Sequence, residues 1–260
     1  MKHLVFFAIA LLCTLPAHAA EKLKATYGLY TGGVRMIGVD AVFDTRPDTY
    51  GVSVSARTLG VFSKLLPWWG DFDTSGVNPG YQPARHDYTV SWMGRVDKAT
   101  FTYDPPGTFR EMVQTRNGET RTNPVGPDIA AGTRDLLSTM MVALRRQQDT
   151  GSCGGDVLTF DNARSFIVRF KDAGDGAMNN DRLSAYTGPA RACTIEIIPQ
   201  KGKWPKKPRG WLKIQEQAKA GGKLPTLWLA SPGAGMPVIP VRVDIHTKYG
   251  DVIAHLTAVQ

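Results

Sequence analysis

The sequence is a basic chain of 260 residues, with 31 lysines and arginines, 23 aspartates and glutamates, and a formal net charge of +8. Beyond residues 1–19, about 240 residues remain, enough to bury the core of one domain. No segment in that remainder is apolar for long enough to span a bilayer as a helix, so we expect no transmembrane segment in the mature chain.

The first segment has the pattern of an export signal. Lys2 and His3 precede an apolar stretch, residues 4–15, and the small-x-small triplet 17–19 follows Pro16. An apolar stretch of about a dozen residues is too short for a stable membrane anchor. We therefore expect residues 1–19 to be a signal peptide cleaved near Ala19, and residues 20–260 to form one periplasmic domain.

From residue 23 to residue 123 the chain alternates apolar and polar side chains with a period of two, as strands do. Tyr50, Val52 and Val54, for example, share one face of a strand. Short turn signals separate the strands, and Asn117-Gly118 is the strongest of them. Short turns join antiparallel neighbours, so the pattern predicts an antiparallel sheet.

One segment, residues 128–148, has a helical period instead. Its apolar residues recur at steps of three and four and predict a central helix over about 133–148, with Thr133 as its N-cap. This stripe comprises Leu136, Leu137, Met140, Met141 and Leu144. Such a stripe most often packs into a core, but methionine-rich walls also adapt to flexible ligands. At the edge of the stripe we expect a ligand groove formed by Leu137, Met140, Met141, Leu144 and Trp228.

Beyond the helix the strand pattern returns. We expect a polar turn at 172–180, strands at 183–188 and 192–199, and a terminal hairpin turning at Tyr249-Gly250. Between them lies a basic insert, residues 200–224, in which a short helix at 212–219 follows an irregular start.

Two cysteines, Cys153 and Cys193, remain after the apolar segment that carries Cys13 is removed. In an exported chain, two cysteines favour a disulfide, here closing a loop of about 40 residues and stabilising the fold by roughly 3–4 kcal/mol. A metal site would need histidine or carboxylate partners close in sequence, and neither cysteine has such a histidine. We therefore expect a disulfide, no metal and no cofactor.

The C-terminal segment, residues 227–259, carries a resemblance to a known family. It resembles the bacterial envelope family of unknown function numbered 3108 in the order of its parts. These are a Leu-Trp-Leu strand, a loop, a Pro-Val pair, a further strand, Tyr249-Gly250 and a last strand with Leu-Thr. The segment around Asp135 and Ser138 is similar to that family's central helix. The resemblance implies a mainly β fold, an antiparallel curved sheet wrapped as a half-barrel or spiral around one central helix. This shape is similar to the Lol-type lipoprotein carriers, and fold likeness does not transfer function.

Candidate catalytic groups have ordinary alternatives. Ser138 lies near Asp135 but has no histidine close in sequence, so a helix-surface or cap-like role is favoured over a nucleophile. Asp71 and Asp73 share one face of a strand and could pair as acid and base, yet solvated strand residues are commoner. The acidic stretch 172–181 lacks the spacing of a calcium loop. We expect no catalytic site.

The basic insert combines cationic and aromatic side chains that could contact an anionic surface, and a solvated loop is the alternative. Its candidate contacts are Lys203, Trp204, Lys206, Lys207, Arg209 and Trp211. Because export makes nucleic acid an unsuitable target, we expect lipid, lipopolysaccharide or another envelope component. The hypothesis is a non-catalytic periplasmic protein that binds a lipid, an acyl chain or an envelope partner and supports envelope integrity. An envelope hydrolase acting on glycan or ester bonds and a protein–protein interaction module are the alternatives.

Overall fold

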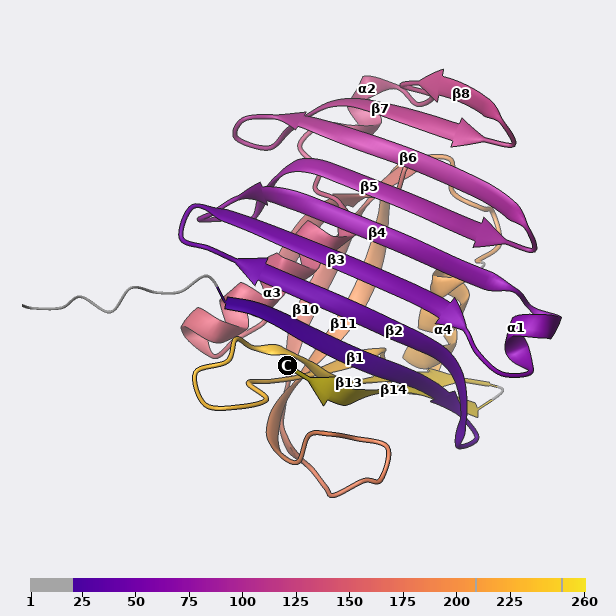
Figure 1. Ribbon diagram of the computed structural model, residues 1–260. Helices are drawn as coiled ribbons and strands as arrows, with labels where there is room; N and C mark the ends of the chain where they lie inside the picture. Colours follow the sequence, from indigo (N-terminus) through magenta and orange to yellow (C-terminus); the bar gives the residue numbers. More distant parts are fainter. Residues whose placement is uncertain (1–20, 209, 249) are drawn as a thin grey trace, which may run out of the picture.

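The computed structural model describes residues 21–208, 210–248 and 250–260 (Figure 1). The predicted signal peptide therefore lies outside the described residues. The strands are β1 (Glu21–Thr31), β2 (Val34–Thr45), β3 (Thr49–Thr58), β4 (Trp68–Val77), β5 (Gln82–Trp92), β6 (Arg95–Asp104), β7 (Thr108–Arg116), β8 (Glu119–Thr122), β9 (Gly155–Phe160), β10 (Arg164–Met178), β11 (Gly188–Gly202), β12 (Thr226–Ala230), β13 (Ile239–Thr247) and β14 (Gly250–Val259). The helices are α1 (Phe62–Leu65), α2 (Pro127–Ala130), α3 (Leu136–Thr150) and α4 (Trp211–Ala220).

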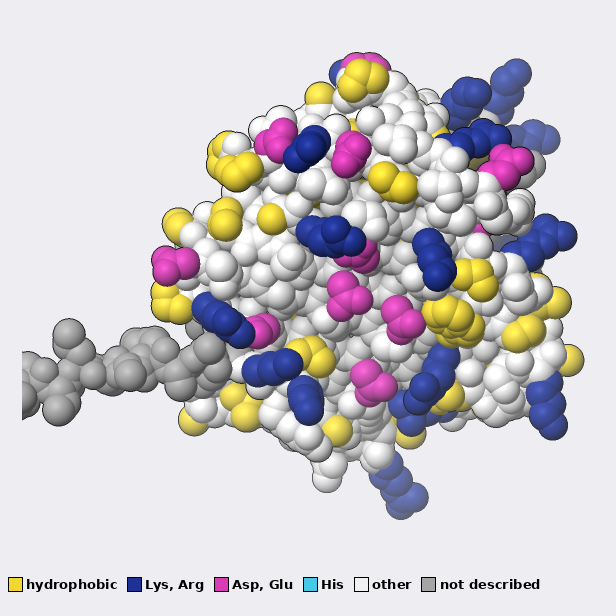
Figure 2. All heavy atoms as spheres, turned by 45° about the horizontal axis from the view of Figure 1, so that its top comes forward, with side chains coloured by type: hydrophobic (Ala, Val, Ile, Leu, Met, Phe, Trp, Pro, Cys, Tyr) yellow, Lys and Arg dark blue, Asp and Glu magenta, His cyan; other side chains and the backbone are white. Residues whose placement is uncertain are grey.

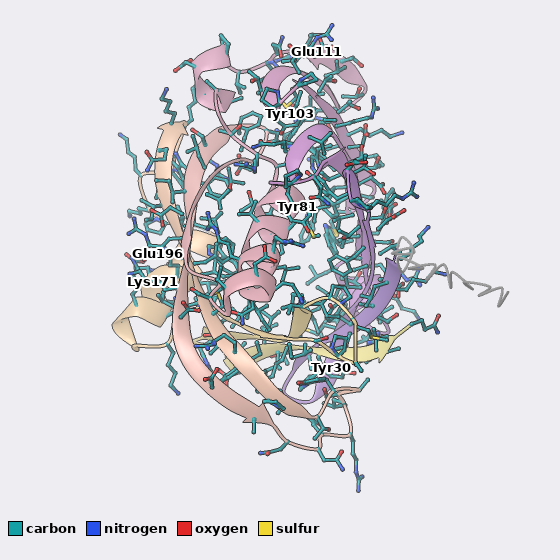
Figure 3. All side chains as sticks on the ribbon, turned by 90° about the vertical axis from the view of Figure 1, so that its left-hand side faces the viewer. Tyr30, Tyr81, Tyr103, Glu111, Lys171 and Glu196 are labelled. Carbon is teal, nitrogen blue, oxygen red and sulfur yellow. A yellow bond between two sulfur atoms is a disulfide. The ribbon has the colours of Figure 1, made fainter. Side chains whose placement is uncertain are left out.

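The described strands form one antiparallel sheet of 14, in the order β8-β7-β6-β5-β4-β3-β2-β1-β14-β13-β12-β11-β10-β9. Strands β1 to β8 are one meander and β9 to β14 a second, and the first and last strands join them with Ala25 opposite Val259. Figure 3 shows α3 inside the curve of this sheet. The predicted mainly β fold, with an antiparallel sheet curved around one central helix, is confirmed.

Side chains, rather than hydrogen bonds between strands, fill the gap between the two edges of the sheet. Phe160 of β9 packs against Phe101 of β6 and Phe109 of β7, with ring centroids 5.4 and 5.6 Å apart. The segment leading into α3 also covers the β9 edge, because the Arg134 N–H donates to the Leu158 carbonyl and the Phe160 N–H to the Arg134 carbonyl, both at 2.9 Å. Covering an edge in this way limits pairing with other chains.

The central helix is present but begins and ends later than predicted. Asp135, not Thr133, is the N-cap, and its carboxylate accepts hydrogen bonds from the first turn. Gly151 ends the helix in the left-handed conformation, with φ at 71°, which glycine adopts without steric cost. Leu136 is 55 % exposed, so the buried face starts one residue after the predicted stripe.

Two predictions for the second half of the sheet were wrong. The supposed turn at 172–180 is largely the continuation of β10, whose pairing with β11 is irregular between Asp172 and Asp175. The supposed strand at 183–188 is irregular chain, and β11 begins at Gly188. Residues 172–180 and 183–188 are rich in polar side chains because this end of the β10–β11 hairpin is largely exposed. The short helix in the basic insert is confirmed as α4.

The outer face of the sheet is polar, with basic and acidic side chains interspersed (Figure 2). Asp71 and Asp73 lie here, both exposed. Among the described residues, no helix has the length and apolar character needed to cross a membrane.

Candidate functional site

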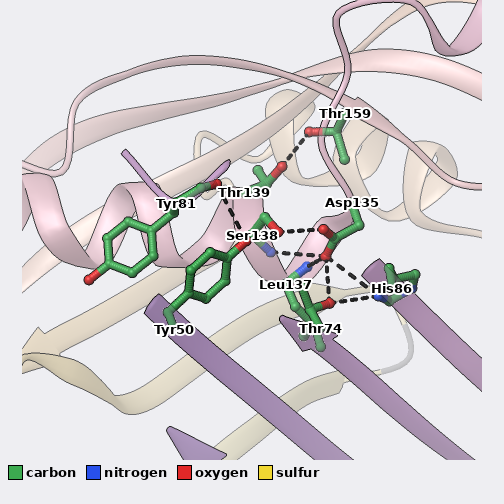
Figure 4. Close-up of polar contacts among 9 residues, drawn as sticks. All are labelled: Tyr50, Thr74, Tyr81, His86, Asp135, Leu137, Ser138, Thr139 and Thr159. Atoms are coloured by element: carbon green, nitrogen blue, oxygen red, sulfur yellow. Dashed lines mark hydrogen bonds and ion pairs between the residues drawn. The ribbon is translucent and has the colours of Figure 1, made fainter. Parts of the chain in front are cut away.

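The start of α3 is the most polar point of the interior. Asp135 is fully buried, and its Oδ1 accepts hydrogen bonds from the Leu137 and Ser138 backbone N–H groups at 2.9 and 3.0 Å (Figure 4). The same oxygen accepts from the Thr74 hydroxyl of β4 at 2.9 Å, and the Ser138 hydroxyl donates to Oδ2. One carboxylate therefore caps the helix and fastens it to the sheet.

Two further side chains extend these contacts into neighbouring strands. The Tyr50 hydroxyl of β3 lies 2.6 Å from the Ser138 hydroxyl, and His86 Nδ1 of β5 lies 2.7 Å from the Thr74 hydroxyl. Tyr50, Thr74, His86, Asp135 and Ser138 are all buried and form what we term the interior polar network.

The acceptor at its centre sets the direction of each hydrogen bond. The hydroxyls of Thr74 and Ser138 both donate their protons to oxygens of the Asp135 side chain. His86 Nδ1 must then carry the proton that it shares with Thr74. Tyr50 donates its proton to Ser138 at 2.6 Å, with the Tyr81 carbonyl as a longer acceptor at 3.4 Å. Within this network Nδ1 is consequently a protonated nitrogen of the His86 ring.

Burial controls the electrostatics of this network. It lowers the pKa of His86 below its ordinary value, and the charge of Asp135, with Nδ1 3.5 Å from Oδ1, opposes that change only in part. Burial likewise raises the pKa of the Tyr50 hydroxyl. Burial therefore favours the neutral form of both side chains, and the chain of hydrogen bonds ends on the Asp135 side chain.

The geometry differs from that of a serine hydrolase. Activation of a serine needs a base that accepts the hydroxyl proton, with a third group orienting the base. Here the Ser138 hydroxyl donates to Asp135, and His86 contacts the opposite side of that carboxylate through Thr74. Ser138 is also fully buried, so the predicted helix-surface position is wrong, while its contacts with the N-cap Asp135 agree with the cap-like alternative. Sequence reasoning missed His86 because it lies on a distant strand, although its position two residues before Tyr88 places both side chains on one face of β5.

Near the other end of α3 lies a cleft of about 500 Å³, which we term the α3 cleft. It is bounded by α3, β2, the 78–81 turn between β4 and β5, and the loop between β12 and β13. The loop is tied to the helix because the Val238 N–H donates to Gln148 Oε1 at 2.8 Å. The apolar side chains lining the cleft include Phe43, Tyr81, Met141, Leu144, Met236, Val238 and Ile239.

The predicted groove residues divide into two sets. Met141 and Leu144 line the α3 cleft, whereas Leu137 and Met140 are half-buried against the main core and do not line it. Trp228 also lies away from the cleft. Its Nε1 donates to Asp244 at 2.7 Å, and a Cβ added to Gly176 would lie 2.5 Å from its ring.

The predicted anionic-surface residues are likewise split. Trp204 stacks under the Arg164 guanidinium, 4.5 Å from the ring centroid, and its Nε1 donates to the Lys201 carbonyl at 3.1 Å. Trp211 is half-buried against the core. The exposed members are Lys203, Lys206 and Lys207, and Arg209 lies outside the described residues. The indole rings of the insert therefore hold it to the protein, while its lysines face solvent.

Cys153 and Cys193 form the predicted disulfide, with Cα atoms 6.3 Å apart and both residues fully buried. It ties the chain just after α3 to β11. Asp172, once a candidate calcium ligand, accepts a hydrogen bond from the Cys153 N–H at 3.1 Å, while Asp175 pairs with Arg191 at 3.0 Å. Among residues that the structure describes, no group of three or more histidine, cysteine or acidic side chains is arranged to hold a metal ion.

These features define a β-barrel-like protein, an open antiparallel sheet filled by one helix, with a buried polar network and a separate apolar cleft. The chain belongs to the DUF3108 family, a family of proteins of unknown function, which matches residues 24–257. A crystal structure of a beta-barrel-like protein of domain of unknown function DUF1849 from Brucella abortus is similar at 10 % identity and a TM-score of 0.48. That match covers 93 % of this chain and 99 % of the other. No curated protein matches the sequence.

Proposed function

We propose that the protein is a non-catalytic periplasmic binding protein that supports the bacterial envelope by holding the acyl chain of an anionic amphiphile in the α3 cleft. The observation that carries this proposal is the cleft beside Met141 and Leu144, two core residues of α3 that also line it. Its volume of about 500 Å³ is within the range of small-molecule sites, roughly 300–1,000 Å³.

The walls suit a flexible hydrocarbon chain. Met141 of α3 and Met236 of the loop both line the cleft, and methionine adapts its shape to irregular ligands. Phe43 and Ile239 add a rigid apolar surface from β2 and β13. Burying a chain here would remove apolar surface from water on both partners.

The rim suits a negatively charged headgroup. Arg46 and Arg145 line the cleft, and each is more than half exposed and paired with a carboxylate, Asp44 at 3.0 Å and Asp149 at 2.6 Å. Exposed ion pairs of this kind contribute little to stability, so an arginine can exchange its partner for a carboxylate or phosphate at small cost.

A binding role is favoured over hydrolysis by the chemistry of the lining. The described residues that line the α3 cleft include no carboxylate, histidine, serine or cysteine. A hydrolytic site needs several such groups converging on the substrate. Export is supported by the disulfide, because such bonds persist in oxidising compartments, and by the signal-like pattern of residues 1–19.

The direct test is binding of a long-chain fatty acid by the mature protein. Displacement of a fluorescent fatty acid, with native mass spectrometry after gentle extraction, should detect one bound chain. A ligand at a hundredfold excess over its Kd adds about 2.7 kcal/mol, which is a rise of roughly 5–10 °C in Tm for a chain of this size. Met236→Glu should weaken binding at least tenfold, because it places a charge in the apolar wall, whereas Val34→Glu, at the exposed start of β2, should not.

Recovery of apo protein alone, without any shift in Tm, would overturn the proposal. Equal effects of Met236→Glu and Val34→Glu would place the ligand outside the α3 cleft.

A further inference from the structure

One corner of the molecule exposes apolar side chains that would ordinarily be buried. Of the ten large hydrophobic residues that are exposed in the described chain, seven lie in α1 with its flanks, at the start of β4, or in the β5–β6 hairpin. Their exposed fractions run from 39 to 65 %. We term them the apolar corner: Val61, Leu65, Leu66, Trp69, Trp92, Met93 and Val96.

Backbone pairing brings these segments together. Trp68 lies opposite Trp92, and the Met93 N–H donates to the Pro67 carbonyl at 2.9 Å, so the hairpin tip adjoins the end of α1. Ser91 pairs with Trp69 on one side and Val96 on the other. The indole rings of Trp92 and Trp69 therefore lie on opposite faces of the sheet, at the same end of strands β4 and β5. The apolar corner thus presents apolar side chains on both faces of this end.

The hairpin tip uses a residue that its backbone does not favour. Met93 has a φ of 52°, in the left-handed region where asparagine and glycine are the usual residues of a two-residue hairpin turn. Its side chain is 55 % exposed, so packing within this chain does not account for it. An apolar side chain at a tip, placed there against the turn preference, points to an external apolar environment.

The chain segments that carry the corner are basic, while Asp71 lines the same surface hollow as Arg57 and Trp69. Residues 57–69 and 91–96 contain Arg57, Lys64 and Arg95 and no acidic residue. Within the described part of the chain, none of these three cations forms an ion pair. In sequence, the first acidic neighbours are Asp71 and Asp97, and Asp97 is paired with Arg116 at 3.5 Å. Figure 2 shows basic and apolar side chains interspersed on the α1 side of the surface.

We propose that the apolar corner docks the protein on an anionic phospholipid surface. Tryptophan rings favour the headgroup level of a bilayer, shorter apolar side chains enter the acyl boundary, and each nearby lysine or arginine adds attraction to anionic lipid. The apolar corner is separate from the α3 cleft, because the two lie near opposite ends of β3. Thr49, at one end, follows Arg46 and Pro47 of the cleft, and Thr58, at the other end, lies beside the corner, roughly 30 Å away.

The test is binding of the mature protein to vesicles, followed by sedimentation and tryptophan emission. Vesicles of equal parts phosphatidylcholine and phosphatidylglycerol should bind at least tenfold more tightly than phosphatidylcholine alone. Trp92→Ser should weaken binding more than tenfold, and the double variant Lys64→Glu/Arg95→Glu by roughly fivefold for each charge. The controls are Val77→Ser, an exposed valine at the other end of β4, and Lys24→Glu on the outer face of β1, and neither should change binding.

Met93→Asn separates docking from a structural role. It supplies the residue that the turn prefers, so Tm should stay equal or rise, while vesicle binding should fall by about fivefold. Fatty-acid binding in the α3 cleft should be unchanged in every corner variant, which keeps the two proposals distinguishable.

Three outcomes would overturn the docking proposal. Equal binding to both vesicle compositions would remove the electrostatic component. A loss per substituted charge that is the same in Lys24→Glu as in Lys64→Glu/Arg95→Glu would mean attraction by net charge alone. A dimer in solution that dissociates in Trp92→Ser, with no vesicle binding, would identify a second copy of the chain as the occupant.

Discussion

Replacement of Asp135 by alanine tests whether the interior polar network holds the central helix in the sheet. The change removes the N-cap of α3 and the acceptor for the Thr74 and Ser138 hydroxyls. Tyr50 and His86 stay buried, but the chain of donors that they join ends without an acceptor.

The expected cost follows from these contacts. Loss of an N-cap costs about 1 kcal/mol, and a hydrogen bond to a charged acceptor contributes about 1.5–3 kcal/mol. Because contacts of one network are not additive, we expect a total loss of about 3–5 kcal/mol from a typical stability of about 5–15 kcal/mol. For a domain of this size that is a decrease of roughly 6–20 °C in Tm.

Urea unfolding followed by circular dichroism measures the effect, with the disulfide intact in every variant. Asp135→Asn should lose less, about 1–3 kcal/mol, because one carbonyl oxygen can still accept from the helix N-terminus. Asp149→Ala, which removes an exposed ion pair with Arg145 from the last turn of the same helix, should stay within about 0.5 kcal/mol of the wild type. A loss below about 1 kcal/mol for Asp135→Ala would refute the assignment of a holding role to this network.

Three further outcomes are expected. Replacing both Cys153 and Cys193 by serine should lower the free energy of unfolding by roughly 3–4 kcal/mol, and free-thiol labelling of the native wild type should find neither cysteine reactive. Burial holds the pKa of His86 below its ordinary value of 6.5, so the unfolded chain takes up a proton before the folded one does. Stability is complete above about pH 6.5 and decreases as the pH falls, and pH-dependent unfolding of His86→Gln should show a shallower decrease than the wild type. Gly76→Ala places a Cβ 2.1 Å from the Gln82 carbonyl oxygen and should cost more than about 3 kcal/mol in urea unfolding, whereas Gly51→Ala on the adjacent strand meets nothing nearer than 3.9 Å and should cost less than about 1 kcal/mol. Equal costs for the two glycine variants, or a parallel pH profile in His86→Gln, would contradict the packing and the burial inferred for these sites.

Much of the fold could be read from local periodicity. Alternation such as Tyr50, Val52 and Val54 predicts a strand with one inward face, and the spacing from Leu137 to Leu144 predicts the helix, because both periods follow directly from backbone geometry. Counting cysteines was sufficient for the disulfide, since only two remain after an export signal. The errors at 172–180 and 183–188 arose where polar, glycine-containing sequence is compatible with either a turn or an exposed strand end.

The sites were decided by tertiary structure. Periodicity shows that His86 and Thr74 face inward, but only the pairing of β4 with β5 and the capping turn of α3 bring them to Asp135. The α3 cleft similarly depends on how the β12–β13 loop lies over Met141, and the apolar corner on the pairing of the hairpin with the chain after α1. The sequence by itself determined the elements and their inward faces, because those depend on neighbouring residues. Which inward faces meet, and where a gap is left between them, depends on strand register and sheet curvature, which are properties of the whole chain.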